Sequence, residues 1–288
     1  MNHYQRQIKH PQQNKKINQP PLKTILSTAW YPLGAKFPEA TFHSWIHNML
    51  SRVKNYYLVV YTNTESLSLF SPYLSNPRIH IVVKPIEEWT QYENRIFWQE
   101  NHTKNVFLNQ KIDWKLNMLW SEKVHFVWNT IMYNYFVEDA QNSMYGWIDI
   151  GYFRGRPVDT ELRRLTEFPN PSRIRALDPT KIHYALVNNK MPQIQYIEHC
   201  VQTGQPIHPQ QISVGGGCFF GTKEKIEEWR DVFTIILQEY IDANKLVKDD
   251  QIIVAEAVFS LKYGGLFYLH REVNPNYDNW FMFSRLLL

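Results

Sequence analysis

Short apolar runs separated by polar and turn residues dominate the first third of the chain. Residues 22–30, 56–61 and 78–83 each form a run of the length and composition of a buried strand. Between the first two runs, apolar residues recur at helical spacing over residues 42–53. A strand, a helix and a strand at this spacing predict a parallel sheet with crossover helices.

The same patterns continue through the rest of the chain. A wide apolar face predicts a long helix over residues 114–135, and an apolar strand then ends near Asp149. Further strands are expected over 181–187 and 266–270, and further helices over 222–244 and 248–261, with Thr222 as the N-cap of the first. We therefore predict an α/β fold: a Rossmann-like, mostly parallel central sheet flanked by helices.

Four stretches depart from simple periodicity. Residues 87–109 predict irregular helix and loop near the site, and residues 155–178 predict irregular structure. Residues 188–209 predict a long loop or a small lobe of the kind that carries substrate contacts. Residues 212–221 contain three consecutive glycines and predict a glycine-rich turn inside a strand pattern, where a ligand approaches the backbone.

The charge is mild and unevenly distributed. The 288 residues carry a formal charge of +4, and Arg6, Lys9, Lys15, Lys16 and Lys23 all precede the first acidic residue, Glu39. Residues 1–21 are polar and rich in Gln, Asn, Lys and Pro, which predicts a flexible basic tail before a single domain over 22–288. The nearly neutral domain argues against nucleic acid as a partner. Six arginines could meet phosphates, although most are expected on the solvated surface: Arg154, Arg156, Arg163, Arg164, Arg173 and Arg175.

Cysteine usage and hydropathy bear on the compartment. Cys200 and Cys218 are the only cysteines, too few for a disulfide framework or a Cys-based zinc site. The sequence has neither an apolar run long enough for a membrane helix nor an apolar signal core at its start. We expect a reducing compartment and a cytoplasmic protein, soluble or peripheral to a membrane, without a transmembrane segment. The oligomeric state is not predicted.

Asp149 is the first candidate for chemistry. It stands where a central apolar strand ends, and Gly151 follows it, where the backbone can turn or a ligand can come close. Ligands of open α/β sheets gather at the carboxyl ends of strands, so an acid there can hold a metal or a polar substrate. The alternative is a strand-end Asp that caps the following turn.

Further candidates have equally plain structural explanations. Lys123 lies at the edge of the predicted 114–135 helix face, either with its stem over apolar neighbours or with its amine aimed at a phosphate or ribose. Asp249 and Asp250 open a helix, where the helix dipole favours acids. His270 ends the last strand and is either bonded to backbone or a ligand. The aromatic residues, 15% of the chain, suit stacking on sugars and bases, although most are expected in the core.

Three segments carry a resemblance to a known family. Residues 147–154 (WIDIGYFR), 119–124 (LWSEKV) and 214–221 (VGGGCFFG) resemble motifs of the HtrL/YibB-like proteins, and the similarity covers roughly residues 24 to 272. These proteins look like GT-A-type glycosyltransferases. The resemblance implies a GT-A-like sheet with a small acceptor-side lobe. It also implies transfer of a sugar from a nucleoside-diphosphate sugar (UDP- or GDP-sugar) to a hydroxyl acceptor, which we expect to be a glycan.

The resemblance also implies roles for individual residues. Asp149 matches the acid where such enzymes keep an Asp-X-Asp metal motif, but Trp147 and Gly151 occupy the positions two residues away. A divalent cation, Mn²⁺ or Mg²⁺, would then bind Asp149 and His270, with the diphosphate and water completing its shell. Asp250 would be the catalytic base, with Asp249 as the second candidate. Donor contacts would come from seven residues: Thr28, Trp30, Lys123, Asp149, Gly151, Gly215 and Gly216.

Two other functions fit the same residues. Because fold does not determine function, the chain could be a non-catalytic protein that binds a glycan or a nucleotide sugar, and the single-acid motif favours this alternative. A nucleotidyltransferase or a sugar-nucleotide hydrolase is a third hypothesis. The sequence does not identify the sugar, the base or the acceptor, or whether the anomeric centre inverts.

Overall fold

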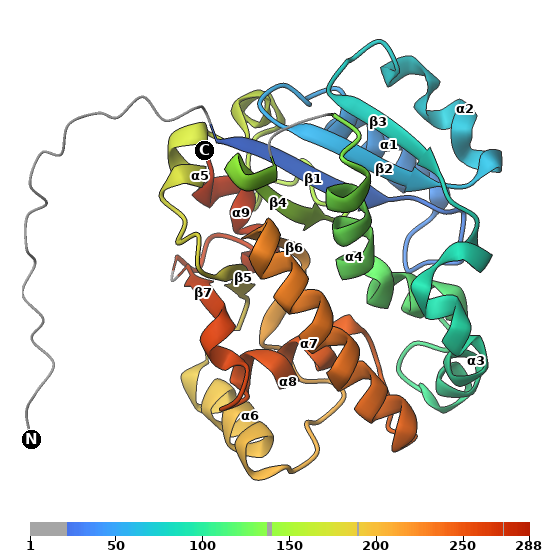
Figure 1. Ribbon diagram of the computed structural model, residues 1–288, viewed down its shortest axis with the longest axis vertical. Coiled ribbons are helices and arrows are strands. Elements are labelled where there is room, and N and C mark those ends of the chain that lie inside the picture. The colour runs from blue at the N-terminus through green and yellow to red at the C-terminus, as the bar shows by residue number, and fades with distance from the viewer. Residues whose placement is uncertain (1–21, 137–139, 189, 273) are drawn as a thin grey trace, which may run out of the picture.

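Seven strands form the central sheet in a computed structural model that describes residues 22–136, 140–188, 190–272 and 274–288. The strand order is β3-β2-β1-β4-β6-β5-β7, and only β6 runs against the other described strands (Figure 1). The strands are β1 (Lys23–Ala29), β2 (Tyr57–Thr62), β3 (Ile79–Val83), β4 (Ser143–Ile148), β5 (Ile182–Leu186), β6 (Val214–Thr222) and β7 (Phe267–Arg271). The predicted α/β class with a mostly parallel sheet is confirmed.

Helices cover both faces of this sheet, because alternate strand residues bury opposite sides. In β1, Ile25 and Ala29 belong to one buried cluster and Leu26 to the other. The first face carries α4 (Trp114–Tyr133), α7 (Lys223–Asp242) and α8 (Asp250–Phe259), with α3 (Arg95–Lys104) and α6 (Met191–Thr203) farther out (Figure 1). The second face carries α1 (Glu39–Leu50), α2 (Leu67–Phe70), α5 (Pro171–Arg175) and α9 (Phe283–Leu286).

Local signals place the ends of the two longest helices. The Asp113 side chain accepts a hydrogen bond from the Lys115 amide at the start of α4, and Asn134 ends that helix in the left-handed conformation, with φ 43°. Thr222 is the N-cap residue of α7, as predicted, but its hydroxyl donates to the Pro179 carbonyl instead of capping the helix. The predicted helices and strands are therefore present, with boundaries that shift by a few residues.

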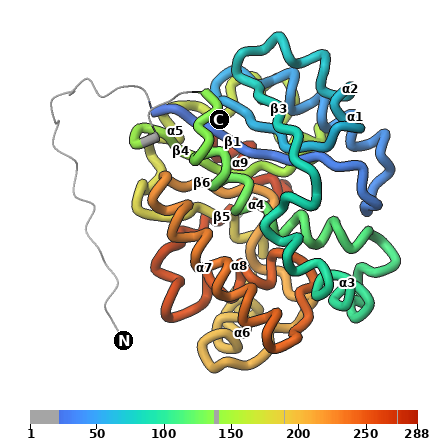
Figure 2. Tube along the Cα trace, turned by 45° about the vertical axis from the view of Figure 1, so that its right-hand side comes forward, coloured from blue at the N-terminus to red at the C-terminus, as the bar shows by residue number. Residues whose placement is uncertain are grey.

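The predicted loop or small lobe over residues 188–209 is wrong. Most of it is α6, which buries Ile194, Ile197 and Cys200 and packs against α8 (Figure 2). Pro192 near the helix start and Gly204 in the left-handed conformation at its end were available signals that the loop prediction overlooked. The segment is thus part of the same α/β domain.

The predictions for two other segments, residues 212–221 and 87–109, also need correction. The triple glycine does not form a turn: Gly215, Gly216 and Gly217 lie inside the continuous strand β6. Within residues 87–109, a regular helix, α3, follows two short 3₁₀ turns. Asn101 and Asn105 there donate to the carbonyls of Val247 and Lys248, so this segment supports the chain just before Asp249.

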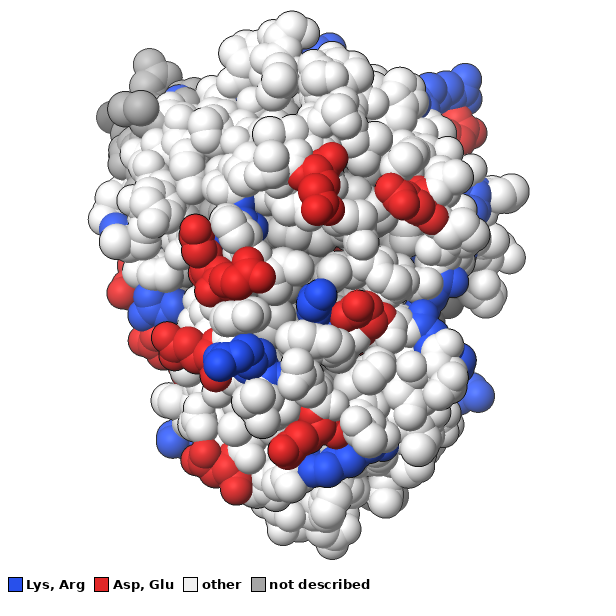
Figure 3. Space-filling view, turned by 90° about the vertical axis from the view of Figure 1, so that its right-hand side faces the viewer, with Lys and Arg blue, Asp and Glu red and all other residues white. Residues whose placement is uncertain are grey.

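Other predictions concern the tail, the cysteines and the surface. The predicted flexible tail, residues 1–21, lies outside the described residues. Cys200 and Cys218 are both free and buried. No helix within the described ranges has the length and apolar character needed to cross a membrane. On the face shown in Figure 3, acidic and basic side chains are interspersed rather than gathered into one basic patch.

Candidate functional site

Asp149 lies directly after β4, at the carboxyl edge of the parallel strands. Its backbone amide donates to the Gly217 carbonyl of β6 at 2.8 Å. The indole Nε1 of Trp147 donates to Asp149 Oδ1 at 2.6 Å. The Asp149 side chain keeps 40% of its surface exposed, whereas Trp147 is buried. Asp149 is therefore held rigidly with one oxygen, Oδ2, left open, as expected for a residue that meets a ligand.

Lys123, on α4, forms the centre of the site. Its Nζ lies 3.1 Å from Asp149 Oδ1 and 3.0 Å from Asp250 Oδ2, and it donates to the Gly216 carbonyl at 2.9 Å. Its side chain is only 5% exposed, so the alternative of a snorkelling lysine is wrong. Burial opposes the ammonium charge, but the two carboxylates outweigh it and raise the pKa of Lys123 above its usual value.

Asp250 is the first residue of α8 and is brought to Asp149 through Lys123. Its side chain is 8% exposed, and no described residue hydrogen-bonds its Oδ1. Burial raises the pKa of Asp250 to about 6, although the Lys123 ammonium favours the ionised form. Asp249, the N-cap residue of α8, instead pairs with Lys248 at 3.1 Å. The acids at this helix start thus have different partners, and Asp250 is the one held against Lys123.

The glycines of β6 make room for the two carboxylates. A Cβ at Gly216 would lie 2.8 Å from Asp250 Oδ2, and one at Gly217 would lie 3.2 Å from Asp149 Oδ2. A Cβ at Gly215 would instead meet Val187 at 2.9 Å, and Gly215 does not line the cavity. A side chain at Gly151 would collide with the Trp45 ring at 2.6 Å. The sequence pattern marked the glycines correctly as points of close approach, but the approaching groups are the protein's own side chains.

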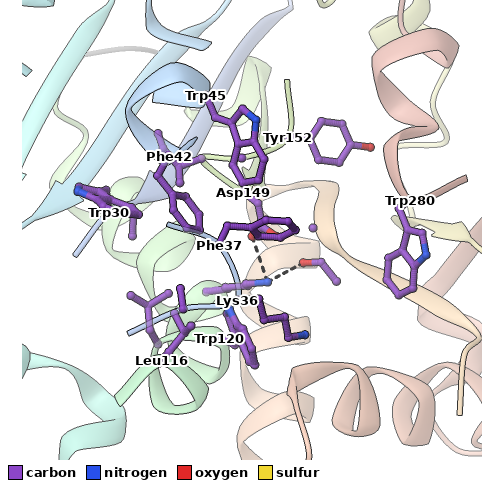
Figure 4. Close-up of a pocket in the computed structure, with 18 of the residues that line it drawn as sticks. Trp30, Lys36, Phe37, Phe42, Trp45, Leu116, Trp120, Asp149, Tyr152 and Trp280 are labelled. Carbon is purple, nitrogen blue, oxygen red and sulfur yellow. Dashed lines mark hydrogen bonds and ion pairs between the residues drawn. The ribbon is translucent and has the colours of Figure 1, made fainter. Parts of the chain in front are cut away.

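A cavity of about 400 Å³ opens beside these groups. Its walls are strongly aromatic, and this size is within the range of small-molecule and cofactor sites. Figure 4 shows Trp30 and Phe42 on one side of Asp149 and Trp280 on the other. Trp30 and Phe42 have ring centroids 4.7 Å apart. The aromatic rings that line the cavity are Trp30, Tyr31, Phe37, Phe42, Trp45, Trp120, Trp147, Tyr152, Trp280 and Phe281.

Sequence reasoning placed some of these residues and missed others. Trp30 lines the cavity as predicted. Thr28 lies within β1, is fully buried and does not line the cavity. Phe42 and Trp45 were assigned to the apolar face of a helix, and Phe37 and Trp280 were not singled out. High aromatic content was the one available signal, and it does not say which rings are in the core and which line a cavity.

Three cationic side chains line the cavity besides Lys123. Arg156 is paired with Asp159 at 2.9 Å and with Asp278 at 2.7 Å. Arg154 makes no described ion pair and is stacked against aromatic rings, and burial lowers its pKa. Lys36 lies over the Trp120 ring at 5.3 Å, and burial lowers its pKa as well.

His270 is not brought together with Asp149. Its Nε2 lies 3.0 Å from His183 Nδ1, on the edge strand β7. Two strands, β6 and β5, separate β7 from β4, a lateral distance of about 14 Å at usual strand spacing. Burial lowers the pKa of His270 to about 4. The predicted pairing of Asp149 and His270 around one cation thus has no geometric support, because the sheet order places two strands between them.

Comparisons with known proteins add no family assignment. The chain matches no protein-family model, and no curated protein sequence is significantly similar to it. The fold and site therefore define a class only: a single α/β domain with a mixed, mostly parallel sheet and an aromatic cavity containing a buried lysine and two carboxylates. The resemblance to the HtrL/YibB-like proteins stays a prediction.

Proposed function

We propose that this protein is a glycosyltransferase with a GT-A-like fold, which transfers a sugar from a UDP- or GDP-sugar to a hydroxyl of a glycan acceptor. The observation that carries the proposal is the meeting of Lys123, Asp149 and Asp250 in one aromatic-walled cavity. These residues come from α4, the end of β4 and the start of α8, far apart in sequence. Their cavity lies at the carboxyl edge of the parallel strands, where open α/β sheets bind ligands.

Asp250 is the proposed catalytic base. Its Oδ1 has no described hydrogen-bond partner, and its raised pKa, about 6, makes it a stronger base than an ordinary carboxylate while leaving it ionised at neutral pH. An acceptor hydroxyl gives its proton to Asp250 as its oxygen forms a bond to the anomeric carbon. The bond from that carbon to the donor diphosphate breaks, and the nucleoside diphosphate leaves with the electron pair.

The aromatic cavity walls suit the nucleobase of the donor and the sugar of the acceptor. Aromatic faces stack on nucleobases and on the apolar faces of sugars at little entropic cost. Trp30, Phe42 and Phe37 line the side nearest β1 and α1, which suits the donor base. Trp280 lies on the other side of Asp149, which suits an acceptor sugar near Asp250 (Figure 4). Asp149 Oδ2, between the two sides, would accept a hydroxyl hydrogen bond from the transferred sugar.

The predicted Mn²⁺ or Mg²⁺ has few protein ligands in this arrangement. A hard cation prefers several oxygen ligands. Trp147 and Lys123 already bind Asp149 Oδ1, and Lys123 binds Asp250 Oδ2. No group of three or more His, Cys, Asp or Glu side chains within the described ranges is arranged to hold a metal. The described side chains thus form no ready-made divalent site, and no step above involves a divalent cation.

A thermal-shift screen with UDP, GDP and their common sugar conjugates, with Mn²⁺ or with EDTA, tests the proposal. A ligand that binds only the folded state raises the melting temperature, so donor nucleotides should stabilise the protein. Transfer to glycan acceptors is then followed by mass spectrometry of the products. Failure of every nucleoside diphosphate and nucleotide sugar to shift the melting temperature would contradict the proposal.

A non-catalytic binding protein is the second candidate, favoured by the single acid of the 147–151 motif. Asp149→Asn and Asp250→Asn separate the two functions. A binding protein has no turnover to lose, so these substitutions can change only its affinity for the ligand. In a transferase, Asp250→Asn removes turnover while donor affinity persists. Release of diphosphate without any acceptor product would instead identify a sugar-nucleotide hydrolase.

A further inference from the structure

Two cations at the cavity, Arg154 and Lys36, have no carboxylate partner among the described residues. The contrast with Arg156 is direct, because Arg156 binds Asp159 through two nitrogens, at 2.9 and 3.0 Å, and also binds Asp278. Neither cation is therefore within ion-pair distance of a described carboxylate, and Asp149 acts on Arg154, and Asp249 on Lys36, only from farther away. A partly desolvated cation that faces a cavity and has no ion-pair partner points to an anionic ligand.

Aromatic rings hold the Arg154 guanidinium in place without removing its charge. Its Cζ lies 4.5 Å from the Trp45 ring centroid, 4.7 Å from that of Phe281 and 5.2 Å from that of Phe37. Its Nε donates to the Gly151 carbonyl at 3.0 Å. Neither terminal nitrogen hydrogen-bonds a described residue. The side chain is therefore oriented in advance, with its two-nitrogen fork still available as a donor.

Lys123 cannot supply the positive charge that a diphosphate needs. Its three ammonium hydrogens face three acceptors: Asp149 Oδ1, Asp250 Oδ2 and the Gly216 carbonyl. With both acids ionised, this trio carries a net charge of −1. An incoming diphosphate adds about two more negative charges, and leaving them unneutralised in a buried site is costly.

We propose that Arg154, with Lys36 as the second cation, binds the diphosphate of the donor, and that Lys123 instead positions Asp149 and Asp250. The inference rests on the proposed function. A guanidinium fork matches two phosphate oxygens, and Lys36 precedes Phe37, one of the rings around Arg154. Two positive charges then balance the two of the diphosphate. Donor binding consequently needs no divalent cation, in agreement with the shortage of metal ligands.

Calorimetric titration tests this assignment. UDP, GDP, inorganic pyrophosphate and the phosphate-free nucleosides uridine and guanosine are titrated into the full-length protein, in EDTA and in Mn²⁺. The variants are Arg154→Gln, Arg154→Lys, Lys36→Gln and the control Arg163→Gln. Arg163 is the matched control because its side chain is 83% exposed and pairs only with Glu161 among the described residues. Arg154→Lys keeps the charge and stem in case the glutamine variant fails to fold.

The expected result is binding of a nucleoside diphosphate in EDTA that weakens about 10- to 100-fold in Arg154→Gln. Arg154→Lys should recover part of the affinity, Lys36→Gln should lose less, and Arg163→Gln should match the wild type. Affinity for the nucleoside should not change. Binding that requires Mn²⁺, or that is equal in wild type, Arg154→Gln and Lys36→Gln, overturns the inference but leaves the proposed function standing. Absence of nucleotide binding under both conditions overturns both.

Discussion

Glu122 and Lys123 are neighbours on α4, carry opposite charges and are both buried, but their surroundings differ. The two Glu122 oxygens accept hydrogen bonds from the backbone amides of Thr90 and Gln91, both at 2.9 Å. Glu122 does not line the cavity, and burial raises its pKa to about 7. Lys123 points in a different direction from the helix, where it meets Asp149 and Asp250 at the cavity wall.

This pair shows that a buried charge with a shifted pKa does not by itself mark a functional site. Glu122 satisfies two amides at the start of a 3₁₀ turn, so its role is to hold the 90–94 segment on α4. Lys123 instead holds the Asp149 and Asp250 carboxylates, each of which has one oxygen without a described hydrogen-bond partner. Access to a cavity, and not burial, separates the two. Substitutions at each residue should therefore have different consequences.

Lys123→Met should have the largest effect. It leaves Asp149 and Asp250 facing each other without a cation, and breaking a buried pair of this kind costs about 3–5 kcal/mol. The loss should be greatest at pH 8 and smaller at pH 5, where Asp250 is protonated. Urea denaturation at both pH values measures it. An equal loss at both values would show that the carboxylates do not repel each other in the variant.

Asp250→Asn should abolish most turnover while preserving the fold. Loss of a general base reduces kcat by roughly 10²–10⁴-fold. Because the pKa of Asp250 is about 6, wild-type kcat/KM should fall about tenfold per pH unit below pH 6 and level off above it. The residual activity of the variant should lack this acid limb. A variant with nearly wild-type turnover, or with the same limb, would exclude Asp250 as the base.

Glu122→Ala should destabilise the fold without removing the chemistry. It leaves two amides without their acceptor, each worth roughly 1–3 kcal/mol, so we expect a loss of about 2–4 kcal/mol. The folded-state pKa values of Glu122 and Asp250 are raised above their unfolded values, so wild-type stability should fall as pH rises from about 4 to 7. The variant should lose part of this slope. Donor affinity measured well below its melting temperature should remain that of the wild type.

Gly216→Ala should have the smallest effect. Its added Cβ meets Asp250, one of the two carboxylate partners of Lys123. The new Cβ would lie 2.8 Å from Asp250 Oδ2, so the carboxylate must move by a few tenths of an ångström. Misplacement of a catalytic group on this scale should lower kcat by roughly tenfold. Gly265→Ala is the matched control, because nothing lies within 4 Å of its added Cβ. Equal kinetics of the two variants would argue against close positioning of Asp250 by β6.

Hydrophobic periodicity was sufficient to predict most of the fold. Strands such as β1 and β2 are continuous apolar runs because both of their faces are covered, and α4 and α7 have wide apolar stripes. The prediction failed where the signal was short or mixed. In α6, three buried residues on a polar helix were too few to outweigh a loop interpretation. In β6, the glycines indicated a turn, although the strand needs them to pass close to Asp149 and Asp250.

The candidate site divides in the same way. The sequence alone determined that Asp149 ends a central strand and that Asp250 begins a helix, because these positions depend on local patterns. Only the tertiary structure decided that Lys123 joins the two acids, that Arg154 stays unpaired where Arg156 does not, and that His270 lies two strands too far away. The physical reason is that charge pairing depends on distances of 3–4 Å between residues from separate elements, which are determined by strand order and helix packing rather than by spacing along the chain.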